Sequence, residues 1–223
     1  MGKTTFAFNI AENLAMKQGL SVLFFSLEMG AEHLARRFHS SIERLSAHKL
    51  RTDKLDDEGW ESASSVHKLE NGPFFIDNTE TLTMTDLASR APRLMTQTGP
   101  LSLIVVDYIQ LMTVETSKKE QNLSRTEIIS ELSHALKDLA CELNCPVIAV
   151  WQLRSRSLEK RSDRRPLMSD LPDAIQQDAD VILFFYRDVV YNNDTSDKKL
   201  PEVIVAKKHK CPVSTLSPAL NDE

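Results

Sequence analysis

The chain has 223 residues, of which 41 % are hydrophobic and 26 % charged, so it can bury a core and is not a disordered chain. No apolar run approaches the roughly 20 residues of a membrane-spanning helix, and no signal peptide is recognisable. Lys and Arg number 27 against 32 Asp and Glu, a net charge of −5, which argues against a protein that coats nucleic acid with its whole surface. The cysteine pattern is typical of reduced thiols, so we expect a cytoplasmic protein without a membrane.

Strands and helices are predicted to alternate along the chain. Continuous apolar runs predict buried strands at residues 21–26, 74–77, 101–107, 146–151, 180–186 and 202–206. Helices are predicted at residues 5–17, 31–45, 56–68, 84–95 and 124–143. In the first helix Phe6, Ile10 and Leu14 share a face, and the last begins with a capping box of Ser124 and Glu127. The order predicts an α/β fold with a mostly parallel sheet covered by helices on both faces, and sites at the carboxyl ends of its strands.

The first of these sites is indicated at the start of the chain. Gly2, Lys3, Thr4 and Thr5 come directly before an amphipathic helix, as in the second half of a P-loop. Amide groups at a helix N-terminus bind phosphate, the lysine reaches the outer phosphates, and the threonine hydroxyl holds Mg²⁺. Four residues are a weak signal by themselves, and an accidental match at a terminus is the alternative.

Polar residues at other strand ends strengthen the interpretation. Asp107 ends the third predicted strand in a Walker B arrangement, which supports Mg²⁺, although any buried strand can end in Asp. Tyr108 follows it where many ATPases have Glu, so a base that positions the attacking water must come from elsewhere. Glu28, after the first strand, is the candidate, and Gln152, after the fourth, is placed to sense the γ-phosphate.

Seven strings in the sequence carry a resemblance to one protein family. They are MGKTTFAFNIAENLA, LFFSLEM, LRTDKLDDEGW, LIVVDYIQLM, ALKDLACELNCPVIAVWQL, RSLEKRSDRRPLMSDL and QQDADVILFFYRDVVY. The chain thereby resembles the C-terminal motor domain of the DnaB-type replicative DNA helicases over residues 2–212, and the SLEM, DYIQLM and QDAD elements are highly specific in combination. The resemblance implies a RecA-like ATPase core, a hexameric ring with ATP between subunits, and movement along single-stranded DNA driven by hydrolysis.

The resemblance also implies a set of site residues. Those implied to bind the nucleotide are Gly2, Lys3, Thr4, Thr5, Lys207 and His209, those implied to act in catalysis are Glu28, Asp107 and Gln152, and Thr4 and Asp107 would hold Mg²⁺. Glu28 corresponds to the family's catalytic glutamate, Gln152 to its coupling glutamine, and Lys207 to the lysine that a neighbouring subunit contributes to the nucleotide.

The sequence departs from the family pattern in several places. The strand and loop that form the first half of the P-loop, the N-terminal domain and the linker helix are not found before Met1, and the family's final strand is missing, so we expect residues 1–223 to be one motor domain truncated at both ends. His209 stands where the family has an arginine finger, and a neutral imidazole does not offer a bidentate fork. His134 also replaces an arginine. The DNA-binding loop at residues 170–175 is shorter and contains Pro172, which has no amide proton.

Positive charge is concentrated in two stretches. Residues 154–165 carry six basic and two acidic side chains, and Lys207, Lys208 and Lys210 form a second cluster, so the rest of the chain is strongly acidic. The first stretch is a candidate surface for DNA or for a neighbouring subunit, with a solvated loop as the alternative. The candidate DNA-binding residues are Arg154, Arg156, Arg161, Arg164 and Arg165.

Two functions are predicted for this sequence. The first is the motor domain of an ATP-dependent replicative DNA helicase, with ATP and Mg²⁺ as cofactors and with single-stranded DNA, further copies in a homo-hexamer, primase and a helicase loader as partners. The alternative is a truncated or decayed helicase paralogue without turnover, acting at most as a subunit-interaction module. Another RecA-type ATPase is disfavoured by the SLEM and QDAD strings. For the 223-residue chain itself we expect weak or no ATPase activity.

Overall fold

The computed structural model describes residues 2–30, 33–34, 72–79, 81–113, 124–153, 161, 163–187, 202–208 and 214–216. The chain divides into two compact units. The first unit contains the described residues of 4–115 and 139–151, and the second contains those of 1–3, 116–138 and 152–222. The predicted helices at 31–45 and 56–68 lie outside the described residues, apart from His33 and Leu34.

A parallel sheet forms the centre of the first unit. Its four strands are β1 (Val22–Ser26), β2 (Phe74–Asp77), β3 (Leu103–Asp107) and β4 (Val147–Ala149), in the order β2-β1-β3-β4. Val22 lies opposite both Phe74 and Leu103, and Ser26 lies opposite Asp107. Every residue of β1 and β3 is buried, as the continuous apolar runs predicted.

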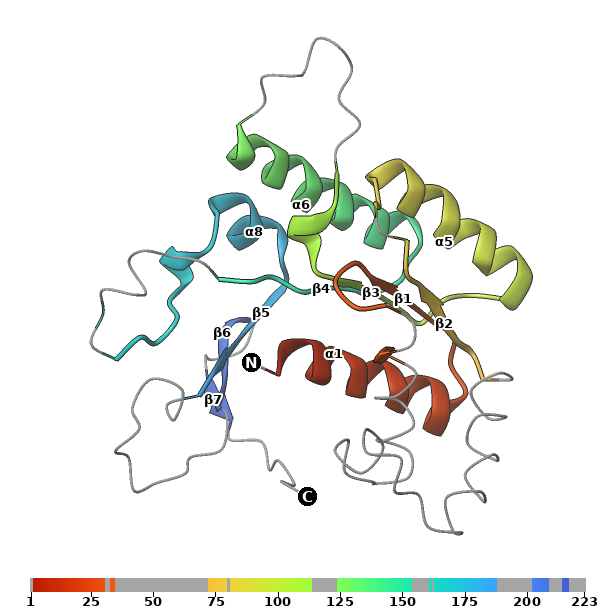
Figure 1. Cartoon of the computed structure of the whole chain (residues 1–223), viewed down its shortest axis with the longest axis horizontal. Coiled ribbons are helices and arrows are strands. Elements are labelled where there is room, and N and C mark those ends of the chain that lie inside the picture. The colour runs from red at the N-terminus through yellow and green to blue at the C-terminus, as the bar shows by residue number, and fades with distance from the viewer. Residues whose placement is uncertain are drawn as a thin grey trace. The chain divides into compact units, whose positions relative to one another are not determined.

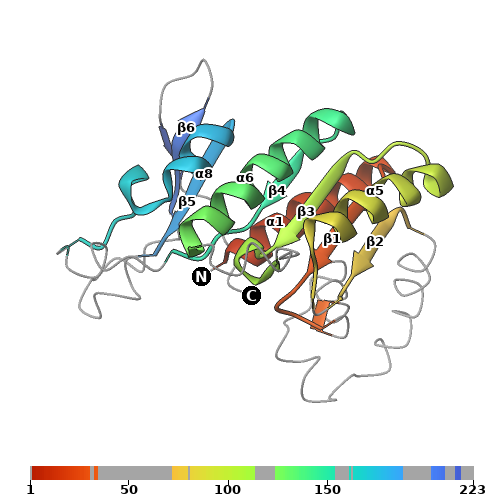
Figure 2. The ribbon, with the colours of Figure 1, turned by 90° about the horizontal axis from the view of Figure 1, so that it is seen from above.

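Helices α1 (Lys3–Glu12) and α5 (Met84–Thr98) cover opposite faces of this sheet (Figures 1 and 2). A π-helical segment, η1 (Asn13–Lys17), continues α1. Ala7, Phe8 and Ala11 of α1 and Ala15 of η1 are buried, and Ile10 and Leu14 of the predicted apolar face are partly buried against the same cluster. The three alanines let the helix approach the sheet closely, and the Phe8 ring lies 5.9 Å from that of Phe24 and 5.6 Å from that of Phe74.

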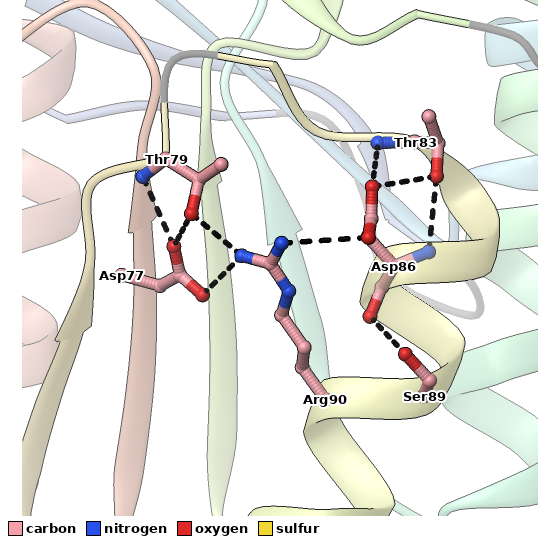
Figure 3. A network of polar contacts seen from close by, with 6 residues as sticks. All are labelled: Asp77, Thr79, Thr83, Asp86, Ser89 and Arg90. Atoms are coloured by element: carbon pink, nitrogen blue, oxygen red, sulfur yellow. Dashed lines mark hydrogen bonds and ion pairs between the residues drawn. The ribbon is translucent and has the colours of Figure 1, made fainter.

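A polar network ties the end of β2 to the start of α5 (Figure 3). Arg90 is at its centre, because its Nη1 donates to Asp77 at 2.7 Å and to Thr79 at 2.6 Å. Its Nη2 lies 3.4 Å from Asp86, which forms a capping box with Thr83 at the first turn of α5. The network therefore fixes how the chain turns from the strand into the helix.

The sheet of the second unit is antiparallel. Its strands are β5 (Val181–Tyr186), β6 (Glu202–Lys208) and β7 (Ser214–Leu216), in the order β5-β6-β7. We predicted β5 as a strand buried on both faces, which is wrong, because Val181 is 51 % exposed and Leu183 36 % exposed. Antiparallel sheets commonly leave alternate side chains in solvent, and a short apolar run does not distinguish the two cases. Strand β7 was not predicted.

Helices α6 (Arg125–Glu142) and α8 (Asp173–Asp178) complete the described elements, with short 3₁₀ turns η3 (Ile109–Leu111) and η4 (Met168–Asp170). The predicted capping box of α6 is confirmed, since the Ser124 amide donates to Glu127 at 2.7 Å and the Glu127 amide donates back at 3.3 Å. Among the described helices, none has the length and apolar character that crossing a membrane requires.

Candidate functional site

Glu28 and Asp107, two of the predicted catalytic residues, both lie at the carboxyl edge of the parallel sheet. Beyond the pairing of Ser26 with Asp107, the Leu27 amide donates to the Asp107 carbonyl at 2.8 Å. The Ser26 hydroxyl donates to the Met29 carbonyl at 2.7 Å and closes a turn that presents Glu28 to solvent. Asp107, in contrast, is buried, since only 1 % of the residue is exposed to solvent. The edge therefore combines an exposed carboxylate with a buried one.

The first turn of α1 reaches the same edge. The chain passes from η1 through Gly19 directly into β1, so α1 runs antiparallel to that strand. Residues 3–17 span about 22 Å along a helix axis, which exceeds the roughly 16 Å of a five-residue strand. Thr4, in the first turn of the helix, therefore lies at the end where β1 and β3 finish. Gly2 precedes the helix with a φ of +81°, a conformation that glycine adopts without strain.

Thr4 and Asp107 also lie on the same face of the sheet. Side chains alternate along a strand, so Asp107 points to the same face as Leu103 and Val105. Those two residues pack in one cluster with Ala7 and Phe8 of α1. Thr4 and Asp107 are thus placed on one face and at one edge, and a hydroxyl with a carboxylate is a donor set that suits Mg²⁺. The residues present fit the predicted metal.

A third segment joins this edge after β4. The Val150 amide donates to the Val106 carbonyl at 2.9 Å, and the Ile109 amide donates to the Val150 carbonyl at 3.1 Å. The segments that follow β3 and β4 are thereby held together, and Gln152 comes two residues after Val150. By compactness Gln152 is grouped with the second unit, unlike Glu28 and Asp107.

We also considered the cysteines and possible clusters of metal-binding side chains. Cys141 is exposed and Cys145 buried, both are free thiols, and burial raises the pKa of Cys145 to about 11. Across the described ranges there is no group of three or more His, Cys, Asp and Glu side chains that could hold a metal ion.

Lys207 occupies a defined place in the second unit. It lies on β6, and its ammonium donates to the carbonyls of Gln176 at 2.7 Å and Gln177 at 3.1 Å, near the end of α8. The neighbouring Asp178 carboxylate accepts a hydrogen bond from Ser133 at 2.6 Å and lies 2.8 Å from His134 Nδ1. The predicted nucleotide-binding residue His209 lies outside the described residues.

Two of the predicted DNA-binding arginines make ion pairs within the second unit. Arg161 pairs with Asp170, whose side chain is fully buried. Arg165 pairs with Glu202 at 2.7 Å, and its guanidinium lies 4.9 Å from the centre of the Tyr186 ring. The remaining candidates are Arg164, which is exposed, and Arg154 and Arg156, which lie outside the described residues.

The comparisons with known proteins identify the family of the chain. The family model described as the DnaB-like helicase C-terminal domain matches residues 1–223. The chain belongs to this family. A replicative DNA helicase DnaB of Buchnera aphidicola subsp. Baizongia pistaciae is 43 % identical over 225 residues, which is 99 % of this chain and 48 % of that relative. The chain thus spans about half the length of the curated relatives it matches.

Solved structures of related proteins share the fold. An ATPase domain with 32 % identity superposes with a TM-score of 0.86, covering 97 % of this chain and 76 % of that one. A DnaB-like replicative helicase, solved in a study of its interactions with primase, has 33 % identity and a TM-score of 0.87, covering 100 % of this chain and 53 % of that one. The predicted family and the α/β, RecA-like fold class are confirmed.

Sequence reasoning missed several residues that shape the site. Ser26 was read only as the end of a strand, although its hydroxyl forms the turn that carries Glu28. Asp178 was read only as part of the QDAD string, and its partner Ser133 is 45 positions away along the chain. A buried serine at the end of an apolar strand is the signal that would have identified Ser26.

Proposed function

We propose that the chain is the motor domain of a replicative DNA helicase, which couples ATP hydrolysis to movement along single-stranded DNA. The observation that carries the proposal is the carboxyl edge of the parallel sheet, where the start of α1, the Glu28 turn and the buried Asp107 lie together. The family match over residues 1–223 supports it. We also propose that both units belong to one motor domain.

The side chains at this edge divide the work of phosphoryl transfer. Lys3 and the amides of the first turn of α1 bind phosphate, and Thr4 with Asp107 holds Mg²⁺. When bound, ATP and Mg²⁺ supply the transferable phosphoryl group and the charge that stabilises its transfer. Glu28 orients the attacking water and takes its proton, for which an exposed carboxylate on a turn closed by Ser26 is suited. Gln152 senses the terminal phosphate.

The second unit supplies the contacts made across a ring. Six copies assemble, and Lys207 of one copy contacts the nucleotide of the next. Single-stranded DNA is bound by Arg164 with Arg154 and Arg156, while Arg161 and Arg165 hold the fold through Asp170 and Glu202. Primase and a helicase loader are further proposed partners, in the cytoplasm.

Nucleotide binding tests the proposal directly. We expect the chain to bind a fluorescent ATP analogue in the presence of Mg²⁺ and to turn over ATP weakly, with stimulation by single-stranded DNA. Lys3→Ala should weaken binding at least about tenfold, because the charged contact to phosphate is lost. Lys17→Ala, at the exposed end of η1, is the matched control and should leave binding unchanged.

Each negative result has a defined meaning. A chain that binds no nucleotide under these conditions is not the proposed motor. A chain that binds nucleotide, does not turn it over with DNA and does not form a ring in gel filtration corresponds to the alternative, a paralogue that interacts with other helicase subunits. Pro172, the N-cap residue of α8, makes no side-chain capping hydrogen bond, and it and His134 are the features that favour this alternative.

A further inference from the structure

The junction between α8 and β5, residues 176–180, is held from two sides. On one side, Asp178 Oδ2 accepts a hydrogen bond from Ser133 Oγ at 2.6 Å, and its Oδ1 lies 2.8 Å from His134 Nδ1, both on α6. On the other side, Lys207 of β6 donates to the carbonyls of Gln176 and Gln177. The end of α8 is therefore enclosed between a helix and a strand of the same unit.

These contacts compensate for the shortness of α8. A helix of six residues does not hold its conformation in isolation, so its position depends on tethers. Its last carbonyls carry partial negative charge, which an ammonium group satisfies. Lys207 Nζ has three N–H donors, and the two carbonyls use two of them. Among the described residues the third has no acceptor, and its direction is set by the other two.

Burial identifies Asp178 as the main anchor of the junction. Its side chain is 15 % exposed and serves two partners on α6. The nearby pair of Lys137 with Asp180 spans 2.5 Å, but the Asp180 side chain is 62 % exposed, so solvent screens this pair. Removing Asp178 should release the end of α8, whereas removing Asp180 should not.

The other end of α8 leads to the predicted DNA-binding loop. The Gln176 side-chain amide donates to the Leu171 carbonyl at 2.8 Å, and the carbonyl of the same residue accepts from Lys207. Leu171 lies between η4 and α8; the prediction of a loop over residues 170–175 is wrong in part, because residues 173–175 form the first turn of α8 and Asp170 ends η4. One residue thus connects the loop to the lysine through two adjacent hydrogen bonds, without passing through the parallel sheet.

We propose that Asp178 is a positioning residue that acts through Lys207. By anchoring α8 to α6, it holds two backbone carbonyls where they orient the Lys207 ammonium toward a nucleotide phosphate. The inference rests on the proposed function, because that function assigns Lys207 to the nucleotide. It adds that displacement of Leu171 and Pro172, which lead into α8, moves this helix and, with it, the ammonium group.

The position of the ammonium can be measured without any activity. Amine acylation of the unmodified chain, followed by peptide fragmentation and mass spectrometry, gives separate rates for Lys207 and for its exposed neighbour Lys208, which is an internal reference. We expect Lys207 to react about fivefold more slowly than Lys208, because its amine must give up about one net hydrogen bond in order to react. Asp178→Ala should bring the two rates together, Ser133→Ala should do so in part, and Asp180→Ala should change neither.

A nucleotide titration then tests the link to function. In the chain that keeps Lys207, Asp178→Ala should weaken binding of the fluorescent ATP analogue about fivefold. In the Lys207→Ala background the same substitution should have no further effect, which a general loss of structure would not produce. Asp178→Asn, which keeps the shape and one acceptor, should restore part of the affinity.

Three results would be informative in different ways. An unchanged Lys207 acylation rate in Asp178→Ala overturns the inference, and Ser133→Ala provides the same reading if Asp178→Ala does not fold. Equal weakening by Asp178→Ala in both backgrounds also overturns it, since Asp178 would then act independently of Lys207. Failure of the unaltered chain to bind nucleotide overturns the proposed function and the nucleotide role of Lys207, while the acylation rates still report the tether.

Discussion

At the scale of single residues, Arg90 connects more structure than any other side chain in the network at the end of β2. It contacts Asp77 and Thr79 beyond the strand, and Asp86 in the helix cap. Burial raises the pKa of Asp77, but hydrogen bonds from Thr79 and Arg90 outweigh it and hold that pKa below its usual value. The same Asp77 hydrogen bond raises the pKa of Arg90. The charged forms are therefore the ones that the fold stabilises.

Replacing Arg90 with alanine should lower the free energy of unfolding by about 1 kcal/mol in urea titrations near neutral pH. The Arg90 side chain is 35 % exposed, which keeps the loss below that of a buried pair. Arg93→Ala is the matched control on the exposed side of α5 and should change the free energy by less than about 0.5 kcal/mol. Equal effects of the two substitutions would mean that the network does not stabilise the fold.

The contribution of Arg90 should depend on pH in a defined direction. Because the pKa of Asp77 is lowered in the folded state, its stabilising contribution is complete above the unfolded pKa of about 4 and is lost as the pH falls through the folded value. The difference between the original chain and Arg90→Ala should therefore be constant from pH 7 to about 5 and shrink below about 4. A difference that grows on acidification would contradict this assignment.

At the scale of elements, the way a helix ends decides where the next strand begins. Helix α5 stops at Gly99, whose amide donates to Met95 and whose φ and ψ are 87° and −171°. This backbone region is open almost only to glycine. A Cβ atom placed there would meet no other atom within 4 Å, so the constraint comes from the backbone alone. Gly99 thus directs the chain toward β3 and Asp107.

Gly99→Ala should destabilise the chain by about 1–3 kcal/mol, because a non-glycine residue is strained in that conformation. Urea unfolding followed by circular dichroism measures the change. Gly30→Ala is the control, since its Cβ atom also meets nothing within 4 Å and its φ is not in the positive range. A result in which Gly99→Ala costs no more than Gly30→Ala would show that the backbone can relax at this helix end.

The sequence predicted those helices and strands that are marked by a pattern within their own residues. The Ser124 and Glu127 pair marks the start of α6, and the FFID run marks β2 from Phe74 to Asp77. The π-helical turn η1, strand β7 and the one-sided burial of β5 have no such signal, because they depend on which segments pack together. The burial of Ala7, Ala11 and Ala15 was not predicted, because it comes from close approach of the helix to the sheet rather than from side-chain size.

The residues of the candidate site also fall into those that could be placed from the sequence and those that could not. Asp107 and Glu28 could be placed from the sequence, because each follows an apolar strand and the carboxyl ends of parallel strands meet at one edge. The carboxylates that pair with Arg161 and Arg165 could not, since nothing near them marks Asp170 or Glu202 as their partners. A run of arginines was therefore read as one surface, although part of it belongs to the fold.

At the scale of the whole molecule, the distribution of charge matters more than its sum. The net charge is −5, yet residues 154–165 carry six basic side chains. Ion pairing neutralises Arg161 and Arg165 within the second unit. The charge that remains for a polyanion in this stretch is therefore smaller than its composition indicates, and we expect DNA binding to be weakly salt-dependent.

Two neighbouring arginines can be compared, because Arg164 is exposed and Arg165 pairs with Glu202. Arg164→Ala should reduce the slope of log affinity against log salt by about 0.7 for single-stranded DNA, since one phosphate contact is lost. Arg165→Ala should leave that slope unchanged and lower the free energy of unfolding by about 1 kcal/mol, because the Glu202 pair and the Tyr186 contact are lost. Fluorescence anisotropy at several salt concentrations and urea unfolding give the two quantities. The reverse pattern would assign Arg165 to DNA.

The strand order β2-β1-β3-β4 has a consequence for the newly made chain. Among the described strands of this sheet β1 is synthesised before β2 and β3, with which it pairs, and Asp107 follows Ser26 by about 80 residues. At roughly 5–20 residues per second on the ribosome, β1 waits about 4 to 16 s for β3. Strand β2 is made during that interval, but the edge of β1 that pairs with β3 lacks its partner until β3 appears, and this edge of a fully buried strand is a binding segment for chaperones or for other nascent chains. The strand order sets this delay whatever the stability of the finished fold.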